Sequence, residues 1–173
     1  MNFSLKPHPL VAHWVPGMTF LVLVWGSRHG WNFREMAAGN SNNIWYMLIF
    51  SVGAFVIGQV FDAFRDTLIE RFLDKGKTLD WEKIINAEAT KADRFEDYYF
   101  TYYVLDWNLA LSLIASLLFT SCAINCICTR LCMCLVILVL AALFISNAIS
   151  LRKEMIKIVE GWPLKKEDNE KTA

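Results

Sequence analysis

The chain contains 173 residues, of which 55% are hydrophobic and 20% are charged. A soluble domain of this size normally carries about a quarter charged residues, so the composition disfavours a soluble globular protein. The 17 basic and 17 acidic side chains give a formal net charge of zero, which provides no general attraction for nucleic acid. The apolar residues are also gathered into four runs, and this arrangement predicts an integral membrane protein.

The first apolar run, Leu10–Trp25, is the shortest and contains His13, Pro16 and Thr19. Its 16 residues would reach about 24 Å as a helix, less than the roughly 30 Å of a hydrocarbon core. A re-entrant segment is therefore one alternative, and a cleaved signal peptide is another. The bulky Trp25 stands where a cleavage site needs a small residue. We expect a short spanning helix around which the bilayer is locally thinned.

The second run, Ile44–Phe61, is interrupted mainly by small residues. Ala54 and Gly58 form a small-xxx-small pair, which allows another helix to approach closely. Apolar residues continue at helical spacing through segment 62–74, so the helix should extend beyond the membrane as an amphipathic helix. The candidates for an oligomer interface are Ala54 and Gly58 in the membrane and Phe64, Leu68 and Phe72 beyond it.

A further amphipathic helix should begin at Thr78 or Asp80, after a break at Gly76. Whether it continues through Lys91–Asp97 into the third span stays open. The aromatic residues at the start of that span either anchor it at the membrane interface or form a specific binding site. Segment 62–107 is too small to bury a large core of its own, so its apolar residues must pack against each other or against other subunits, and we expect an oligomerisation or partner surface.

The third and fourth apolar runs are Leu109–Cys128 and Leu131–Leu151. The last helix should continue to about Val159, because Gly161 and Pro163 follow.

One face of the third span carries polar residues at every fourth position. Close helix packing explains this pattern, because small residues let helix backbones approach and buried amides bond across the interface. The alternative is a water-filled pathway in an oligomer. Ionisable residues at depth are functional candidates, and only Asp106 and His13 qualify. The pore-lining candidates are Asn108, Ser112, Ser116, Thr120 and Asp106.

Lys and Arg residues are distributed unevenly between the two sides of these spans. One precedes the first span, seven lie in segment 62–97 and six follow Leu151, whereas the two remaining connections hold two and one. The positive-inside rule then places both termini and the central segment in the cytoplasm, by 14 basic residues to three. A plasma or inner membrane is the expected location. If the first run does not span, only the amino terminus changes side.

All the cysteines lie close together near the connection between the third and fourth spans. Their spacing is not that of a zinc module and no histidine is near, so we expect no metal site. A disulfide across the turn is an alternative if the turn faces an oxidising compartment. Otherwise these residues act as small apolar side chains. The five are Cys122, Cys126, Cys128, Cys132 and Cys134.

The sequence contains no phosphate-binding loop, serine-hydrolase elbow or zinc-protease helix. We therefore expect neither an enzyme nor a cofactor.

Two segments carry a similarity to a known family. They are His13–Gly17 at the head of the first span and Glu96–Phe100, which runs on into Asp106–Asn108. With these segments, its length and its four helices, the chain resembles the small membrane accessory proteins found beside RNA-targeting type VI-B CRISPR effectors. The resemblance implies an oligomeric membrane pore with a divergent HEPN-like helical region, acting in antiphage defence. The Arg and His pair of HEPN ribonucleases is missing, because no His follows His29, so ribonuclease activity is not implied.

We expect an all-α integral membrane protein with four transmembrane helices and a small cytoplasmic helical layer. Its expected parts are a first hairpin (1–61), cytoplasmic amphipathic helices (62–107), a second hairpin (108–151) and a tail (152–173). The leading hypothesis is a homo-oligomeric membrane pore or channel-like effector, with the lipid bilayer and further copies as partners. The alternative is a non-conducting membrane adaptor that presents its cytoplasmic helices to a soluble protein.

Overall fold

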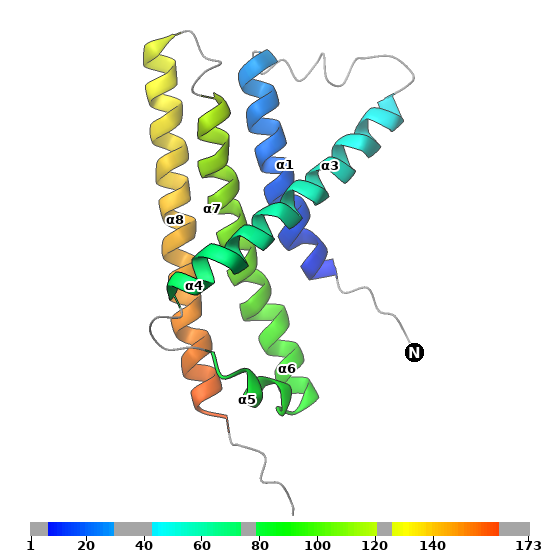
Figure 1. The fold of residues 1–173 in the computed structure, drawn as a ribbon, viewed down its shortest axis with the longest axis vertical. Coiled ribbons are helices and arrows are strands. Elements are labelled where there is room, and N and C mark those ends of the chain that lie inside the picture. The colour runs from blue at the N-terminus through cyan, green and yellow to red at the C-terminus, as the bar shows by residue number, and fades with distance from the viewer. Residues whose placement is uncertain (1–6, 30–42, 74–78, 121–125, 163–173) are drawn as a thin grey trace, which may run out of the picture.

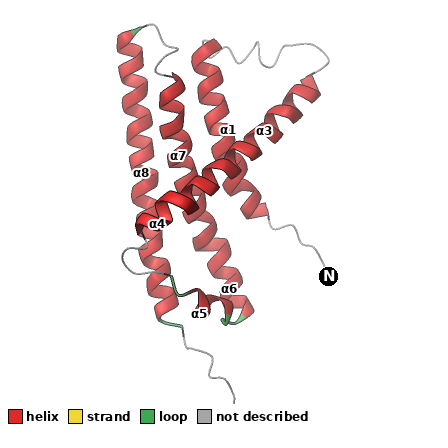
Figure 2. Cartoon of the chain, in the orientation of Figure 1, coloured by secondary structure: helices red, strands yellow, loops and turns green. Residues whose placement is uncertain are grey.

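The computed structural model describes residues 7–29, 43–73, 79–120 and 126–162. Nearly all of these residues are helical, and no strand occurs among them (Figure 2). Four helices are long and apolar enough to cross a membrane. The predicted all-helical fold with four such helices is therefore confirmed. Helices α1 (Pro7–His29), α7 (Thr101–Thr120) and α8 (Ile127–Glu160) lie alongside one another, and α3 (Asn43–Phe64) crosses them obliquely (Figure 1).

Helix α1 is longer than the apolar run that it contains. Its 23 residues reach about 34 Å, which is enough for a hydrocarbon core of roughly 30 Å. The continuous helix is therefore long enough to cross a membrane. Pro16 lies inside this helix and is buried.

Helix α3 continues past the end of its apolar run, as predicted. A π-helical turn, η1 (Arg65–Ile69), and a short helix, α4 (Glu70–Leu73), extend it without a break. A π turn holds more residues per turn than an α-helix, and such turns are frequent at functional sites.

Two close approaches fix the crossing of α1 and α3. The α-carbon of Gly17 faces the backbone of Ala54, and that of Gly58 faces the backbone of His13. A Cβ atom at either glycine would overlap the facing carbonyl oxygen. Only glycine permits this separation of the two backbones. The small residues of α3 therefore pack against a helix of the same chain.

The helix that was predicted to begin at Thr78 or Asp80 begins directly after Asp80, as α5 (Trp81–Ile85). The backbone N–H of Lys83 donates to the Asp80 carboxylate at 3.2 Å, which satisfies one of the free amides at the helix start.

Helix α5 ends within two turns, and α6 (Ala89–Phe95) starts after an extended Glu88. From α6 the chain stays helical through a second π turn, η2 (Glu96–Phe100), into α7. The helix that begins after Asp80 therefore does not itself run on into the third span, and a separate helix that begins at Ala89 does.

The connection between α7 and α8 differs from the prediction. Residues 127–130, which include the expected break at Arg130, belong to α8, and α7 ends at Thr120. Apolar residues lie on both sides of the break, so the hydrophobicity of the sequence does not indicate its position. The other end of α8 agrees with the prediction, because it stops at Glu160 and Gly161 follows as its cap.

The expected division of the chain does not coincide with breaks in its helices. The boundaries after residues 61, 107 and 151 fall inside α3, α7 and α8 respectively. Each of these helices therefore joins two of the expected parts rigidly.

Short helices pack around the carboxyl-terminal part of α8 at one end of the bundle (Figure 1). We call this region the end layer: α5, α6, η2 and residues 152–162. It shares an apolar core with the lower part of α7. Its buried members include Leu79, Phe95, Tyr103, Met155 and Val159.

Candidate functional site at the helix crossing

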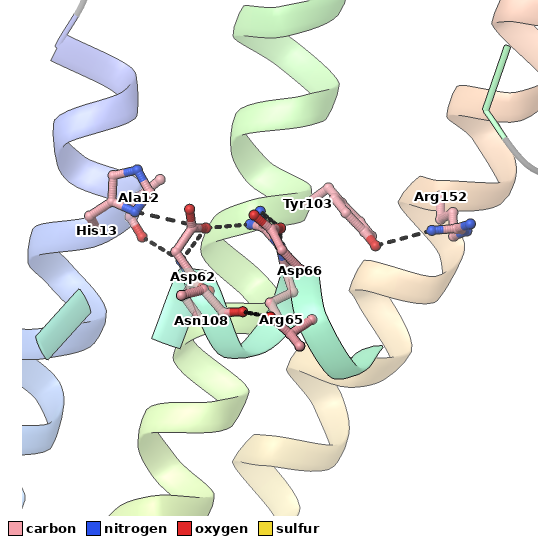
Figure 3. Close-up of polar contacts among 10 residues, drawn as sticks. Ala12, His13, Asp62, Arg65, Asp66, Tyr103, Asn108 and Arg152 are labelled. Carbon is pink, nitrogen blue, oxygen red and sulfur yellow. Dashed lines mark hydrogen bonds and ion pairs between the residues drawn. The ribbon is translucent and has the colours of Figure 1, made fainter. Parts of the chain in front are cut away.

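A cluster of charged and polar side chains lies where α1, α3 and α7 meet (Figure 3). We call it the crossing cluster: His13, Asp62, Arg65, Asp66 and Asn108. Asp62 continues the close-packed face of α3, four residues after Gly58. The glycine contacts bring the backbones together, and this proximity buries the polar groups that follow.

Arg65 is the buried cation of the crossing cluster, with 3% of its surface exposed. Its Nη1 lies 2.7 Å from Asp62 Oδ1, and its Nε donates to Asp66 Oδ1 at 3.1 Å. An unpaired buried charge is strongly destabilising, so these carboxylates are what allow an arginine here. All three residues come from one stretch of helix at the start of η1.

Asn108 links the cluster to the other two helices. It is fully buried, and its Nδ2 donates to Asp62 Oδ1 and to the backbone oxygen of Ala12, each at 3.3 Å. His13 Nδ1 lies 3.9 Å from Asp62 Oδ1, beyond hydrogen-bonding distance. The buried Nδ1 of His13 and Oδ1 of Asn108 have no hydrogen-bond partner among the described residues.

A cavity of about 120 Å³ adjoins the cluster, between the two π turns. It has room for about four water molecules at about 30 Å³ each. The Thr101 hydroxyl donates a hydrogen bond to the backbone carbonyl oxygen of Glu96, five residues earlier, at 2.8 Å. This bond gives the carbonyl oxygen a side-chain partner in the widened turn. The lining residues are Ala12, His13, Asp62, Arg65, Glu96, Phe100, Thr101 and Val104.

Further polar contacts join α7 to α8 near the same level. Asn147 Nδ2 donates to Asp106 Oδ2 at 2.6 Å, and Arg152 Nη1 donates to the Tyr103 hydroxyl at 3.4 Å. Asp106 and Arg152 are 6% and 7% exposed, respectively. Polar groups therefore connect all four long helices toward one end of the bundle. This arrangement can fix the helices and hold water.

The pore-lining candidates lie inside the single chain. Asn108, Ser112 and Ser116 are fully buried, and Thr120 is 2% exposed. The Ser112 and Ser116 hydroxyls donate to backbone oxygens of their own helix at 2.9 and 2.7 Å. This face packs within the chain and presents no open surface to an oligomer axis.

The oligomer-interface candidates fall into two groups. Ala54 and Gly58 are buried against α1 of the same chain, so that surface is already occupied. Phe64 and Phe72 are 50% and 68% exposed, so they leave an apolar surface open. The side chain of Leu68 lies outside the described part of the structure.

The cysteines that the structure describes, Cys126, Cys128, Cys132 and Cys134, are free thiols. Cys122 lies outside the described residues. No group of three metal-binding side chains occurs in the described ranges.

The sequence places Asp62 on the face of the second span that also carries Ala54 and Gly58, whereas Arg65 and Asp66 were treated only as charges between apolar residues. One signal could have singled out Arg65, because it follows Asp62 by one helical turn. That spacing places an ion pair on the face that packs most closely.

The chain matches no protein-family model, and neither a curated protein nor a solved structure is found to be similar to it.

Proposed function

We propose that this chain is a multi-pass membrane protein that acts as a non-conducting adaptor. Its four long helices hold it in the bilayer, and its end layer faces the cytoplasm, as the distribution of Lys and Arg favours. There it is presented to a soluble protein.

One observation carries this proposal: large apolar side chains are exposed on the end layer. Ile85 is 79% exposed and Trp81 is 50% exposed. The layer already has a core, so these side chains are not needed to form it. Large apolar side chains that are exposed outside the apolar part of the bundle are typical components of protein-interaction sites.

The closed interior supports the non-conducting part of the proposal. Ser112 and Ser116 are buried and bonded to their own helix, and the crossing cluster ties α1, α3 and α7 together. Cysteines placed at 112 and 116 in a cysteine-free background should therefore resist polar thiol reagents. A cysteine at the exposed Asn86 is the reactive control. Labelling at 112 and 116 as fast as at 86 would contradict a closed interior.

Site-specific photo-crosslinking tests the partner. A photoreactive residue at Ile85 should crosslink in cells to one soluble protein, and Trp81→Asp should abolish the product. The same residue placed at Leu138, on the exposed face of α8, serves as the control for contacts unrelated to the layer. If position 85 gives only crosslinks to lipid or to a second copy, the adaptor proposal fails.

The second candidate is the homo-oligomeric pore, with the antiphage role that the family resemblance implies. The exposure of Phe64 and Phe72 favours it, because a row of apolar side chains on a helix suits contact between copies. Phe64→Asp should then dissociate the assembly while the chain remains inserted. Solute release from reconstituted vesicles by the wild-type chain, lost in this variant, would favour the pore over the adaptor.

A further inference from the structure

A second recess lies in the end layer, apart from the crossing cluster. It is a groove of about 420 Å³ between α6, η2 and the end of α8. This volume falls within the range of small-molecule sites, roughly 300–1,000 Å³. The groove is lined by Lys91, Arg94, Phe95, Tyr99, Ile158 and Trp162.

The groove combines aromatic rings with cations. The Phe95 ring stacks on Tyr99 with centroids 6.3 Å apart and meets the Trp162 ring edge-on at 5.6 Å. Phe95 is 4% exposed and forms the base, whereas Tyr99 and Trp162 are only partly buried and leave ring surface open. Such surfaces accept the flat face of another ring.

The charged residues that line the groove, Lys91 and Arg94, are both positive. Arg94 is exposed, and no acidic side chain lines the groove among the residues that the structure describes. Lys91 pairs with Glu88 at 3.3 Å, but both side chains are more than half exposed, so the pair is weak and the ammonium group can turn to a ligand. A guanidinium is well suited to binding phosphate through two parallel hydrogen bonds.

We propose that this groove binds a small anionic ligand that carries a flat heterocyclic ring, of the mononucleotide class. The rings of Tyr99 and Trp162 stack on the heterocycle, and Arg94, assisted by Lys91, binds the phosphate. The site is independent of the adaptor function and of the crossing cluster.

The position of the groove favours a soluble ligand over a lipid headgroup. Ile158 lies seven residues beyond Leu151, where the apolar run of α8 ends, or about 10 Å along the continuous helix. The headgroup region on each side of a bilayer is only about 5–8 Å thick. With α8 crossing the membrane, the groove therefore reaches the water beyond the headgroups.

Equilibrium dialysis of the full chain in neutral-lipid nanodiscs tests this proposal with ATP as the probe. We expect saturable binding of one ATP per chain. Adenosine, which has only the ring, and tripolyphosphate, which has only the charge, should each compete at least tenfold more weakly than ATP. Equal competition by either would overturn the proposal, and so would the absence of saturable binding.

Variants assign the binding to the groove. Arg94→Gln should weaken ATP binding at least tenfold, whereas Lys153→Gln, an exposed cation on α8 outside the groove, should change it less than twofold. Trp162→Ala should weaken binding and Trp162→Phe should restore most of it. Because Arg94 is exposed, its variant decides the question even if Trp162→Ala does not fold. Unchanged binding in Arg94→Gln would place ATP elsewhere.

Nanodiscs rich in phosphatidylglycerol separate the two sources of phosphate. ATP binding should persist in them with no more than a threefold loss. Displacement of ATP by the anionic lipid would identify a headgroup as the occupant and overturn the proposal.

Discussion

At the scale of single residues, the buried Arg65 is central to the crossing. It contacts two carboxylates that differ in their surroundings: Asp62 is 20% exposed, and Asp66 is 54% exposed. Asp62 also accepts a hydrogen bond from Asn108 and so links α3 to α7, whereas the more exposed Asp66 bonds only to Arg65 within the crossing cluster. The two carboxylates should therefore contribute unequally to stability.

Asp62→Ala should destabilise the fold by about 3 kcal/mol, because it leaves a buried cation with one partner fewer and frees the Asn108 amide. Asp66→Ala is the matched control and should cost less than about 1 kcal/mol, as for other exposed ion pairs. Thermal unfolding of the detergent-solubilised chain, followed by the loss of its helical circular dichroism signal, measures the difference. Equal losses of stability in the two variants would mean that the buried carboxylate of Asp62 is no more important to Arg65 than the exposed carboxylate of Asp66.

A second prediction at this scale concerns Cys126, which precedes α8. A hydrogen bond from the Thr129 side chain, with backbone hydrogen bonds from Thr129 and Cys128, lowers the pKa of the Cys126 thiol. More thiolate is then present at a given pH, so alkylation should reach half its maximal rate below the pH expected for a free cysteine. Thr129→Val should raise the pKa and move this midpoint upward. Alkylation rates with iodoacetamide in a chain that retains only Cys126 provide the test, and a midpoint unaffected by Thr129→Val would contradict it.

At the scale of helices, the approach of α1 to α3 depends on the absence of side chains. Gly17 and Gly58 face carbonyl oxygens of the opposite helix. A Cβ atom at Gly53, also on α3, would lie 3.9 Å from Leu21 Cδ1, an ordinary contact, with no closer atom of the opposite helix among the described residues. The chain therefore provides its own comparison between a glycine that packing requires and one that it does not.

Gly17→Ala should separate α1 from α3 and destabilise the fold by roughly 1–3 kcal/mol, as other overpacking substitutions do. Gly53→Ala should be tolerated or slightly stabilising, because alanine favours a helix. Both variants can be compared by the same thermal unfolding assay. A Gly53→Ala loss as large as that of Gly17→Ala would show that helix flexibility, and not close approach, determines the effect.

At the scale of the whole molecule, α7 is the central helix. It packs against α1 on one side and α8 on the other, and its polar face is turned inward. The end layer then continues α7 and α8 beyond the apolar part of the bundle (Figure 1). The end of α1, the start of α3, the end of α7 and the start of α8 all lie away from the end layer, although the start of α3 is splayed to one side, so neighbouring long helices in the chain run in opposite directions (Figure 1).

This arrangement and the charge distribution lead to a topological prediction. Reporter fusions placed after residue 173 and within 30–42 should report opposite sides of the membrane, with the carboxyl terminus in the cytoplasm, because 14 of the 17 basic residues then lie inside. A fusion within 74–78 should agree with the carboxyl terminus. A carboxyl terminus on the outer side would contradict both the topology and the adaptor proposal.

The sequence alone determined the all-helical fold, the four long apolar helices, the extension of α3 beyond Phe61 and the end of α8 near Gly161. These features follow from local composition and spacing. A helix makes its backbone hydrogen bonds within one segment, and the repeat of its apolar residues is visible in that segment alone. The position of the break before α8 was not determined, since apolar residues lie on both sides of it.

Only the tertiary structure decided which residues meet across helices. The sequence placed Asn108, Ser112 and Ser116 on one face, but it did not reveal that the neighbour covering this face belongs to the same chain. Likewise, Asp62 and Arg65 were visible as charges, whereas their burial depends on how closely Gly17 and Gly58 let α1 approach α3. Contacts between distant segments depend on the relative positions of the helices, and no local pattern along the chain encodes those positions.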